Sequence, residues 1–238
     1  MGNWYQNNRR LFHEERKALA DICPLLRLAI VQPGFKINDV IYIKAECAVV
    51  HGSYGVQVPE EDREIEYGIV MVLPNDYPKH PPELFCNDPK LPINVIDRHI
   101  LEYGKPCLGV TTEINSRWRS KPTVVNFIEN MVAPFLAWQA YFDAFHKPPS
   151  WGERPHFGKG IHEFYAELLG MPPEADIIGF MKLLARKNQP KGHEICPCNS
   201  GELLRNCHRE LVIKTRHQAD WRDVQKDLGG IDNEMGKF

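Results

Sequence analysis

Three apolar, strand-like runs follow one another in the first half of the chain with no helical pattern between them. Residues 41–50 alternate apolar and other side chains, as a strand with one buried face does. Residues 67–74 form a second apolar run, residues 83–87 form a short third one, and residues 52–62 are expected to form a polar turn. Parallel strands need long crossovers between them, so this direct succession favours an antiparallel meander.

Helical patterns flank these strands on both sides. Residues 7–22 carry apolar side chains near one face with charges between them, which predicts an amphipathic helix. From Pro122 onward apolar and aromatic residues recur at steps of three or four, and Pro134 inside this run predicts two helices or one kinked helix. The aromatic side chains are explained by core packing. We therefore predict an α+β domain over residues 1–147.

The remainder of the chain is expected to be smaller and more irregular. Residues 148–189 are interpreted as a linker rich in proline and glycine, followed by short helices, the first of which is stopped by Gly170. Residues 190–213 are expected to form a compact module. Residues 214–238 are expected to form a polar C-terminal tail, and the segment 221–238 is expected to be loosely ordered.

Composition narrows the cellular setting and the class of partner. The formal net charge of −2 over 238 residues gives no reason to expect nucleic acid or an anionic membrane as the main partner. No apolar run approaches membrane-spanning length, and the N-terminal sequence is not that of a signal peptide. The seven cysteines cannot all pair within the chain, which suits a reducing cytoplasm. Cys23, Cys47 and Cys86 are expected to be small buried hydrophobic residues.

Three cysteines and a histidine gather near the C-terminus. Cys196, Cys198, Cys207 and His208 lie within thirteen positions, and thiolates with a neutral imidazole are the ligands of a closed tetrahedral zinc site. A segment this short buries little apolar area, so metal binding would have to drive its folding. The alternative is a cluster of reduced cysteines without a metal ion. We predict a structural zinc ion held by these four residues.

This segment resembles the SEC-C motif, a small zinc-binding module. The motif has two cysteines around one residue, a Ser-Gly turn, and then a cysteine followed by cysteine or histidine. Ser200 and Gly201 stand at the turn between the two ligand pairs. The usual glycine before the serine is Asn199 here, a mild departure because asparagine also tolerates left-handed backbone.

Cys107 is the candidate nucleophile of the larger domain. It follows Gly104 and Pro106, which break regular structure and favour a loop, and it stands eight positions after His99. An exposed thiol on a loop is available to carry a covalent adduct. His99 could orient that loop or act on the proton of the thiol. A Cys–His dyad of a hydrolase is the alternative at this point, with Asp97 as the nearest candidate to orient the histidine.

Residues 1–147 resemble the catalytic domain of the ubiquitin-conjugating enzymes. That family has an N-terminal helix, a strand meander, a Tyr-Pro-x-x-Pro-Pro segment, a His-Pro-Asn motif, a catalytic cysteine eight residues after that histidine, a tryptophan and further helices. The residues that match, in chain order, are Tyr77, Pro78, Pro81, Pro82, Phe85, His99, Cys107, Leu108 and Trp118.

The resemblance implies a chemistry and a set of partners. Cys107 would accept ubiquitin or a related protein as a thioester from an activating enzyme, and an amine of a protein substrate would then attack it. No cofactor is implied in this domain, and His99 would support the active-site loop. The divergent bacterial relatives often lie in antiphage defence operons, so a cytoplasmic defence role is implied, with a nucleotide cyclase as one candidate substrate.

The chain departs from the family motif where an oxyanion donor is expected. The proline and asparagine after the histidine are Ile100 and Leu101 here, and a leucine side chain donates no hydrogen bond. Loss of one such donor typically lowers the rate by about two to three orders of magnitude. Backbone N–H groups or Asn115 could substitute. The alternative function is therefore a catalytically inactive module of the same fold that binds a ubiquitin-like protein or acts as an adaptor.

Overall fold

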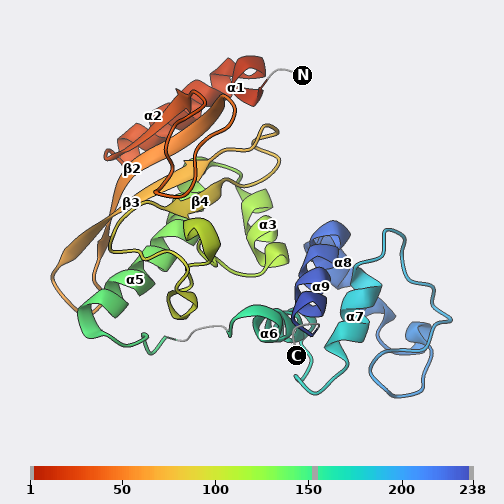
Figure 1. The fold of residues 1–238 in the computed structure, drawn as a ribbon. Helices are drawn as coiled ribbons and strands as arrows, with labels where there is room; N and C mark the ends of the chain where they lie inside the picture. Colours follow the sequence, from red (N-terminus) through yellow and green to blue (C-terminus); the bar gives the residue numbers. More distant parts are fainter. Residues whose placement is uncertain (1–2, 152–154, 236–238) are drawn as a thin grey trace. The chain divides into compact units, whose positions relative to one another are not determined.

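The computed structural model describes residues 3–151 and 155–235 of the chain, which divides into two compact units (Figure 1). The first unit comprises Met1–Leu108 and Trp118–Gly152, and the second comprises Gly109–Arg117 and Glu153–Phe238. The boundary falls inside one helix, α3 (Thr111–Ser120). Within the two described ranges, no helix is both long and apolar enough to cross a membrane.

The predicted antiparallel meander is confirmed. Neighbouring strands pair in chain order, β1 with β2, β2 with β3 and β3 with β4, and every pairing is antiparallel. Together with the surrounding helices they make the fold α+β. The strands are β1 (Leu26–Val31), β2 (Cys47–Gln57), β3 (Glu64–Val72) and β4 (Glu83–Cys86).

Two details of the sheet differ from expectation. β1 was not predicted, and β2 continues through residues 52–57, where a polar turn was expected, while residues 41–46 lie outside it. Tyr54 pairs with Tyr67 across this extension. Most of its residues are half-buried, so polar side chains there keep part of their contact with solvent. At Gly52 a Cβ would lie 2.1 Å from the Leu25 carbonyl oxygen, so glycine allows the chain entering β1 to approach.

The two faces of the sheet are covered by different elements. One face carries Val49, Val70 and Phe85, which pack against Ile37 and Ile43 from the segment between β1 and β2. The other face carries buried side chains of β2 and β3 and is covered by helices, because α5 contacts β2 and α2 contacts β1. The helices on this side are α2 (Arg9–Ile22) and α5 (Ala133–Phe145), and the short α1 (Trp4–Asn7) contacts α2.

The helical run after Pro122 is one continuous segment that contains a wider turn. It consists of α4 (Val124–Phe127), a π-helical turn η3 (Ile128–Val132) and α5. Pro134 lies in the first turn of α5, directly after the π-helical turn. Because proline has no N–H, it cannot complete the regular ladder of hydrogen bonds, and the wider turn accommodates that gap. The predicted irregularity at Pro134 is therefore present as a π-helical turn.

The second unit is built from helices around its own apolar core. Its largest fully buried side chains include Tyr165 and Phe180, which pack with apolar residues from the neighbouring helices. Both predicted short helices are present, and α6 ends at Gly170 in the left-handed conformation (φ 62°). Residues 152–154 of the expected linker lie outside the described residues. The helices are α6 (Phe157–Leu169), α7 (Ile177–Leu184), α8 (Arg209–Gln218) and α9 (Trp221–Met235).

The prediction of a loosely ordered tail over residues 221–238 is wrong for the part that the structure describes. α9 contacts both α6 and α7, and its Val224 and Ile231 are buried in the core of the second unit. Asp223 and Asp227 are buried beside them. Aspartates on the buried face interrupt the apolar period of this helix, so the sequence reads as a polar tail although the helix is part of the core.

Candidate functional site

Cys107 lies at the end of a compact loop that follows β4. We call residues 93–108 the thiol loop. The Cys107 N–H donates a hydrogen bond to the His99 carbonyl oxygen at 2.8 Å. Ile100 bridges to Val95 on one side and to Pro106 on the other. The two predicted residues, eight positions apart in sequence, are therefore joined directly through the backbone.

His99 is placed by an unusual backbone conformation and by an aromatic neighbour. It ends the short 3-10 helix η1 (Ile96–Arg98) with φ 52° and ψ 30°, in the left-handed region that few non-glycine residues adopt. Its half-buried ring packs edge-on against Trp138 of α5, with 5.3 Å between ring centroids. Asp97, the candidate orienter of a Cys–His dyad, is exposed on η1.

Leu101 stabilises the loop through its backbone, since its side chain has no polar group. Its N–H donates to the Lys105 carbonyl oxygen at 2.8 Å, and its own carbonyl oxygen accepts from Gly104 N at 3.2 Å. The Asn38 amide nitrogen donates to the Tyr103 carbonyl oxygen at 2.7 Å. Gly104 has φ 76°, and a Cβ there would lie 2.9 Å from that amide nitrogen, so this tight turn requires glycine.

Two of the other three thiols of the first unit are more enclosed than Cys107. Cys23 and Cys86 are buried, as expected, whereas Cys47 is half-buried. Burial raises the pKa of the Cys86 thiol to about 12, which keeps it protonated and unreactive near neutral pH. Cys107 is half-buried on the thiol loop. Its accessibility is compatible with an adduct.

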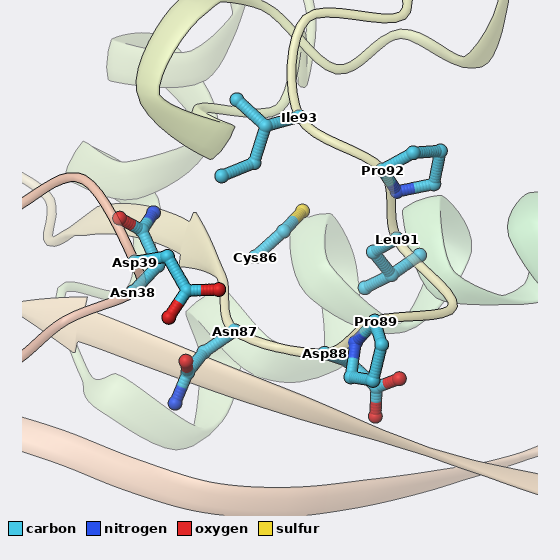
Figure 2. Close-up of a pocket in the computed structure, with 9 residues that line it drawn as sticks. All are labelled: Asn38, Asp39, Cys86, Asn87, Asp88, Pro89, Leu91, Pro92 and Ile93. Atoms are coloured by element: carbon cyan, nitrogen blue, oxygen red, sulfur yellow. The ribbon is translucent and has the colours of Figure 1, made fainter.

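A cavity of about 490 Å³ lies next to the thiol loop in the first unit (Figure 2). Asn38 and Asp39 line one side of it, and Ile93 at the start of the thiol loop lines another. The sulfur of Cys86 points toward its centre, although only 2% of that residue is exposed. Asp88 lies at its rim and accepts hydrogen bonds from the backbone N–H groups of Gly68 and Lys90. The polar groups of this cavity therefore already stabilise the surrounding loops.

Asn115, expected as a substitute oxyanion donor, is committed elsewhere. Its side chain is buried in the second unit, and its amide nitrogen donates to Asp223 Oδ1 at 2.7 Å. That hydrogen bond fixes α3 to α9. The amide is used for helix packing.

The structure brings the four predicted metal ligands together in the second unit. One ligand atom from each of Cys196, Cys198, Cys207 and His208 lies within 4.8 Å of all the others. His208 Nδ1 is 3.3 Å from Cys196 Sγ and 3.1 Å from Cys207 Sγ, and the sulfurs of Cys198 and Cys207 are 3.4 Å apart. These four residues could hold a metal ion.

The backbone and the neighbouring side chains set this geometry. Cys196 N donates to the Glu202 carbonyl oxygen at 2.9 Å, which closes the turn between the first two cysteines and the rest of the cluster. Asn199 occupies the left-handed region with φ 62°, a conformation that asparagine tolerates better than most residues. The His208 ring packs edge-on against Phe180 of α7 at 5.5 Å. The cluster is thus anchored on the core of the second unit.

Hydrogen bonding and burial affect the thiols of the cluster in opposite directions. Hydrogen bonding with the Ser200 side chain lowers the pKa of Cys198 to about 6. Burial raises the pKa of Cys196. Because a thiolate is the form that binds a metal ion, the lowered pKa favours the ligand form of Cys198.

Comparisons with protein-family models, with curated proteins and with solved structures found no match to this chain. The geometry of its own residues therefore carries the functional interpretation.

Sequence reasoning missed the side chains that hold the thiol loop from outside. Arg98 directly precedes His99, and it is hydrogen-bonded to Gln139 and ion-paired with Asp143. Gln139 lies within an apolar helical pattern. One amide side chain among apolar residues was the signal in the sequence that could have indicated a buried polar contact. Asn38 was missed because its partner in the thiol loop lies 65 positions away.

Proposed function

We propose that the first unit is a ubiquitin-conjugating-like carrier that holds a ubiquitin-like protein as a thioester on Cys107. The observation that carries this proposal is the half-buried Cys107 on a loop tied to His99, following a four-stranded antiparallel meander. The order of these elements, a strand meander followed by a histidine and then a cysteine, is the order in the ubiquitin-conjugating enzymes that the sequence resembles. The partners are a ubiquitin-like protein, its activating enzyme and a protein substrate that offers an amine.

The proposed reaction is two successive acyl transfers. The Cys107 thiolate attacks the carbonyl carbon of the thioester on the activating enzyme, so a C–S bond to Cys107 forms as the C–S bond to that enzyme breaks. The released thiolate takes up a proton. A substrate amine then attacks the same carbonyl carbon, a C–N bond forms, the C–S bond to Cys107 breaks and the amine loses a proton.

His99 acts in this proposal as a positioning residue of the thiol loop. Its carbonyl oxygen accepts the Cys107 N–H and its ring packs on Trp138, and both contacts support a role in fixing the thiol. Because the Cys107 N–H is used in this bond, it holds the loop and is not directed at an acyl oxygen. Leu101 likewise contributes backbone hydrogen bonds to the same loop.

For the second unit we propose structural zinc binding by the module over residues 190–213. Zinc bonds of about 2.0–2.3 Å in a tetrahedral shell place neighbouring ligand atoms roughly 3.4–3.8 Å apart. Three of the distances between the ligand atoms, 3.1–3.4 Å, are close to that spacing, and all four atoms lie within 4.8 Å of one another. Three thiols and one imidazole also match the preference of zinc for sulfur and nitrogen ligands.

The carrier proposal is tested by adduct formation. Given the cognate ubiquitin-like protein, its activating enzyme and ATP, the wild-type protein should gain an adduct that a thiol reductant removes. Cys107→Ser should give either an ester that resists the reductant or no adduct at all. The adduct is read on a non-reducing gel and its site by mass spectrometry.

Cys47→Ser is the matched control, because Cys47 is also a half-buried thiol of the first unit. It should leave the adduct unchanged. If the wild type binds the ubiquitin-like protein but carries no reductant-sensitive adduct, the carrier proposal fails and the inactive binding module is the function. If the adduct survives in Cys107→Ser but disappears in Cys47→Ser, Cys107 is not the carrier.

A further inference from the structure

Gln139 and Arg98 exchange two hydrogen bonds directly beside the thiol loop. Arg98 Nε donates to Gln139 Oε1 at 2.9 Å, and Gln139 Nε2 donates back to the Arg98 carbonyl oxygen at 2.8 Å. Gln139 lies on α5 and is 0% exposed. A buried amide that satisfies both a side chain and a backbone group of one residue fixes the position of that residue.

The guanidinium of Arg98 is held from further sides by groups of the first unit. Its Nη2 forms an ion pair with Asp143 Oδ1 at 2.7 Å, and its Nη1 donates to the Lys90 carbonyl oxygen at 3.3 Å. The second oxygen of Asp143 accepts from the Tyr67 hydroxyl on β3 at 2.7 Å. Burial, and then the contact with Asp143, raises the pKa of Tyr67, so its hydroxyl remains a donor.

Aromatic packing continues this arrangement from Arg98 to His99. The Arg98 guanidinium lies 5.0 Å from the centroid of the Phe142 ring, a cation–π contact. Phe142 stacks on Trp138 at 5.4 Å with an interplanar angle of 11°, and Trp138 packs against the His99 ring. Helix α5 thus contacts both His99, which accepts the hydrogen bond from Cys107, and the residue before it, Arg98.

We propose that Arg98, Gln139 and Asp143 form a clamp that positions Cys107, acting through His99. The clamp fixes the carbonyl oxygen of Arg98, the next carbonyl oxygen belongs to His99, and that oxygen accepts the Cys107 N–H. These three are positioning residues, since they contact the loop and not the sulfur. They supply to the loop the rigidity that Leu101 cannot supply through its side chain. The structural part of this inference does not depend on the proposed carrier function. Only its expected effect on the discharge of a thioester rests on that function.

The first arm of the test measures amide hydrogen exchange of Cys107 in the full-length protein. Gln139→Met keeps the approximate volume and removes both hydrogen bonds to Arg98. Loss of such bonds should raise the exchange rate of the Cys107 amide about tenfold or more. The amides that join β2 to β3 should keep their wild-type rates. A merely structural role would raise exchange throughout the first unit.

Glu15→Gln is the matched control for a buried polar change in the same unit. Glu15 is buried and accepts from the Tyr77 hydroxyl and from Val124 N, both outside the thiol loop. This variant should leave Cys107 exchange within about twofold of wild type. If Gln139→Met does not fold, Arg98→Lys decides: it keeps the charge beside Asp143 but cannot bond Gln139 in the same way, so it should also raise Cys107 exchange.

The second arm measures chemistry in a single turnover. The charged thioester is mixed with hydroxylamine, and Gln139→Met should slow the discharge about tenfold while leaving the concentration dependence of charging unchanged. If the wild type forms no thioester, the carrier proposal fails while the exchange arm still decides the clamp. The clamp is overturned if Cys107 exchange stays at the wild-type rate in a folded variant, or if it rises only in parallel with the whole first unit.

Discussion

Two of the cysteine-containing regions of this chain, the thiol loop and the cluster of the second unit, hold their sulfur atoms in opposite ways. In the thiol loop, a backbone hydrogen bond joins Cys107 to His99, and Gln139 of α5 donates a hydrogen bond to the preceding residue, Arg98. In the cluster of the second unit, three sulfurs and an imidazole nitrogen face one another within 4.8 Å. The first arrangement presents one thiol on a loop fixed by other groups. The second brings donor atoms together at a spacing that a bound cation would stabilise.

This difference indicates which interactions stabilise the thiol loop and which would stabilise the cluster. The thiol loop belongs to a unit with a four-stranded sheet and a buried core on both faces, so its geometry does not need a ligand. The cluster has short turns and little regular structure between residues 190 and 208, so ligand bonds would supply much of its stability. Substitutions in the two regions should therefore have different and separable effects.

The largest expected effect comes from removing one ligand of the cluster. Cys196→Ser should lower bound zinc from one ion per chain to less than about a tenth, because apparent zinc-binding free energies in small modules are roughly 10–16 kcal/mol and depend on a complete ligand set. Exchange of the amides in residues 190–208 should rise strongly. Metal analysis of protein purified without chelator, together with hydrogen exchange, measures both.

Cys107→Ser is the counterpart that sharpens the contrast, and it should leave the metal content unchanged. The β2–β3 amides should exchange at wild-type rates in both variants. The comparison breaks if Cys196→Ser retains its metal ion, or if the wild type purified without chelator carries less than about a tenth of an equivalent of zinc.

A smaller effect is expected from a carboxylate that fixes the start of α3 within the second unit. Asp227 accepts from Thr111 N at 3.0 Å, from Thr112 N at 3.1 Å and from the Tyr165 hydroxyl at 2.9 Å. Asp227→Asn places an amide where acceptors are needed, so the free energy of unfolding should fall by about 1–3 kcal/mol. Denaturant unfolding of the two proteins measures this difference.

Glu210→Gln, on the exposed surface of α8, is the control for that measurement and should change the free energy of unfolding by less than about 0.5 kcal/mol. An Asp227→Asn protein as stable as wild type would mean that this unit depends on its apolar core and metal ligands alone. In that case buried polar contacts would be important in the first unit and not in the second.

The smallest expected effect is a pH dependence in the first unit. Burial raises the pKa of Glu15 above its ordinary value of 4.5. A raised folded-state pKa means that the folded protein binds the proton more tightly, so this contribution to stability is present below about pH 4.5 and is lost as pH rises through the folded pKa. Relative to Glu15→Gln, the wild type should lose at most about 1.4 kcal/mol per pH unit in that interval.

Unfolding free energies of both proteins between pH 4 and pH 7 test this prediction, since glutamine does not titrate and the difference isolates Glu15. A wild type that gains stability over the variant as pH rises would show that the hydrogen bonds from Tyr77 and Val124 outweigh burial.

Local sequence patterns were sufficient to predict those helices and strands whose buried residues recur at the regular period of the element. The helix over Arg9–Ile22, the apolar strands β3 and β4, and α7 with its buried Ile177 were predictable because one face of each is apolar at the expected period. The four metal-type ligands were predictable because they are close in sequence and chemically specific. Gly170 was predictable as a helix end because glycine adopts the left-handed conformation there without strain.

Long-range contacts account for what was missed. The first residues of α3 are polar, and the carboxylate that caps them lies 116 positions away on α9. β1 is a short strand whose pairing with β2 was not anticipated. The clamp on Arg98 joins residues 41 positions apart, and no local pattern relates them.

The sequence by itself determined the α+β class, the succession of β2, β3 and β4 as an antiparallel meander, the position of Cys107 on a loop and the four residues that could hold a metal ion. These follow from periodicity, turn residues and closely spaced chemical groups, which are local properties of the chain. Only the tertiary structure decided which groups fix the thiol loop, that Asn115 is used in packing, and that the C-terminal segment forms a core helix. Buried polar groups take their partners from distant elements, because each must find a hydrogen bond wherever the fold provides one.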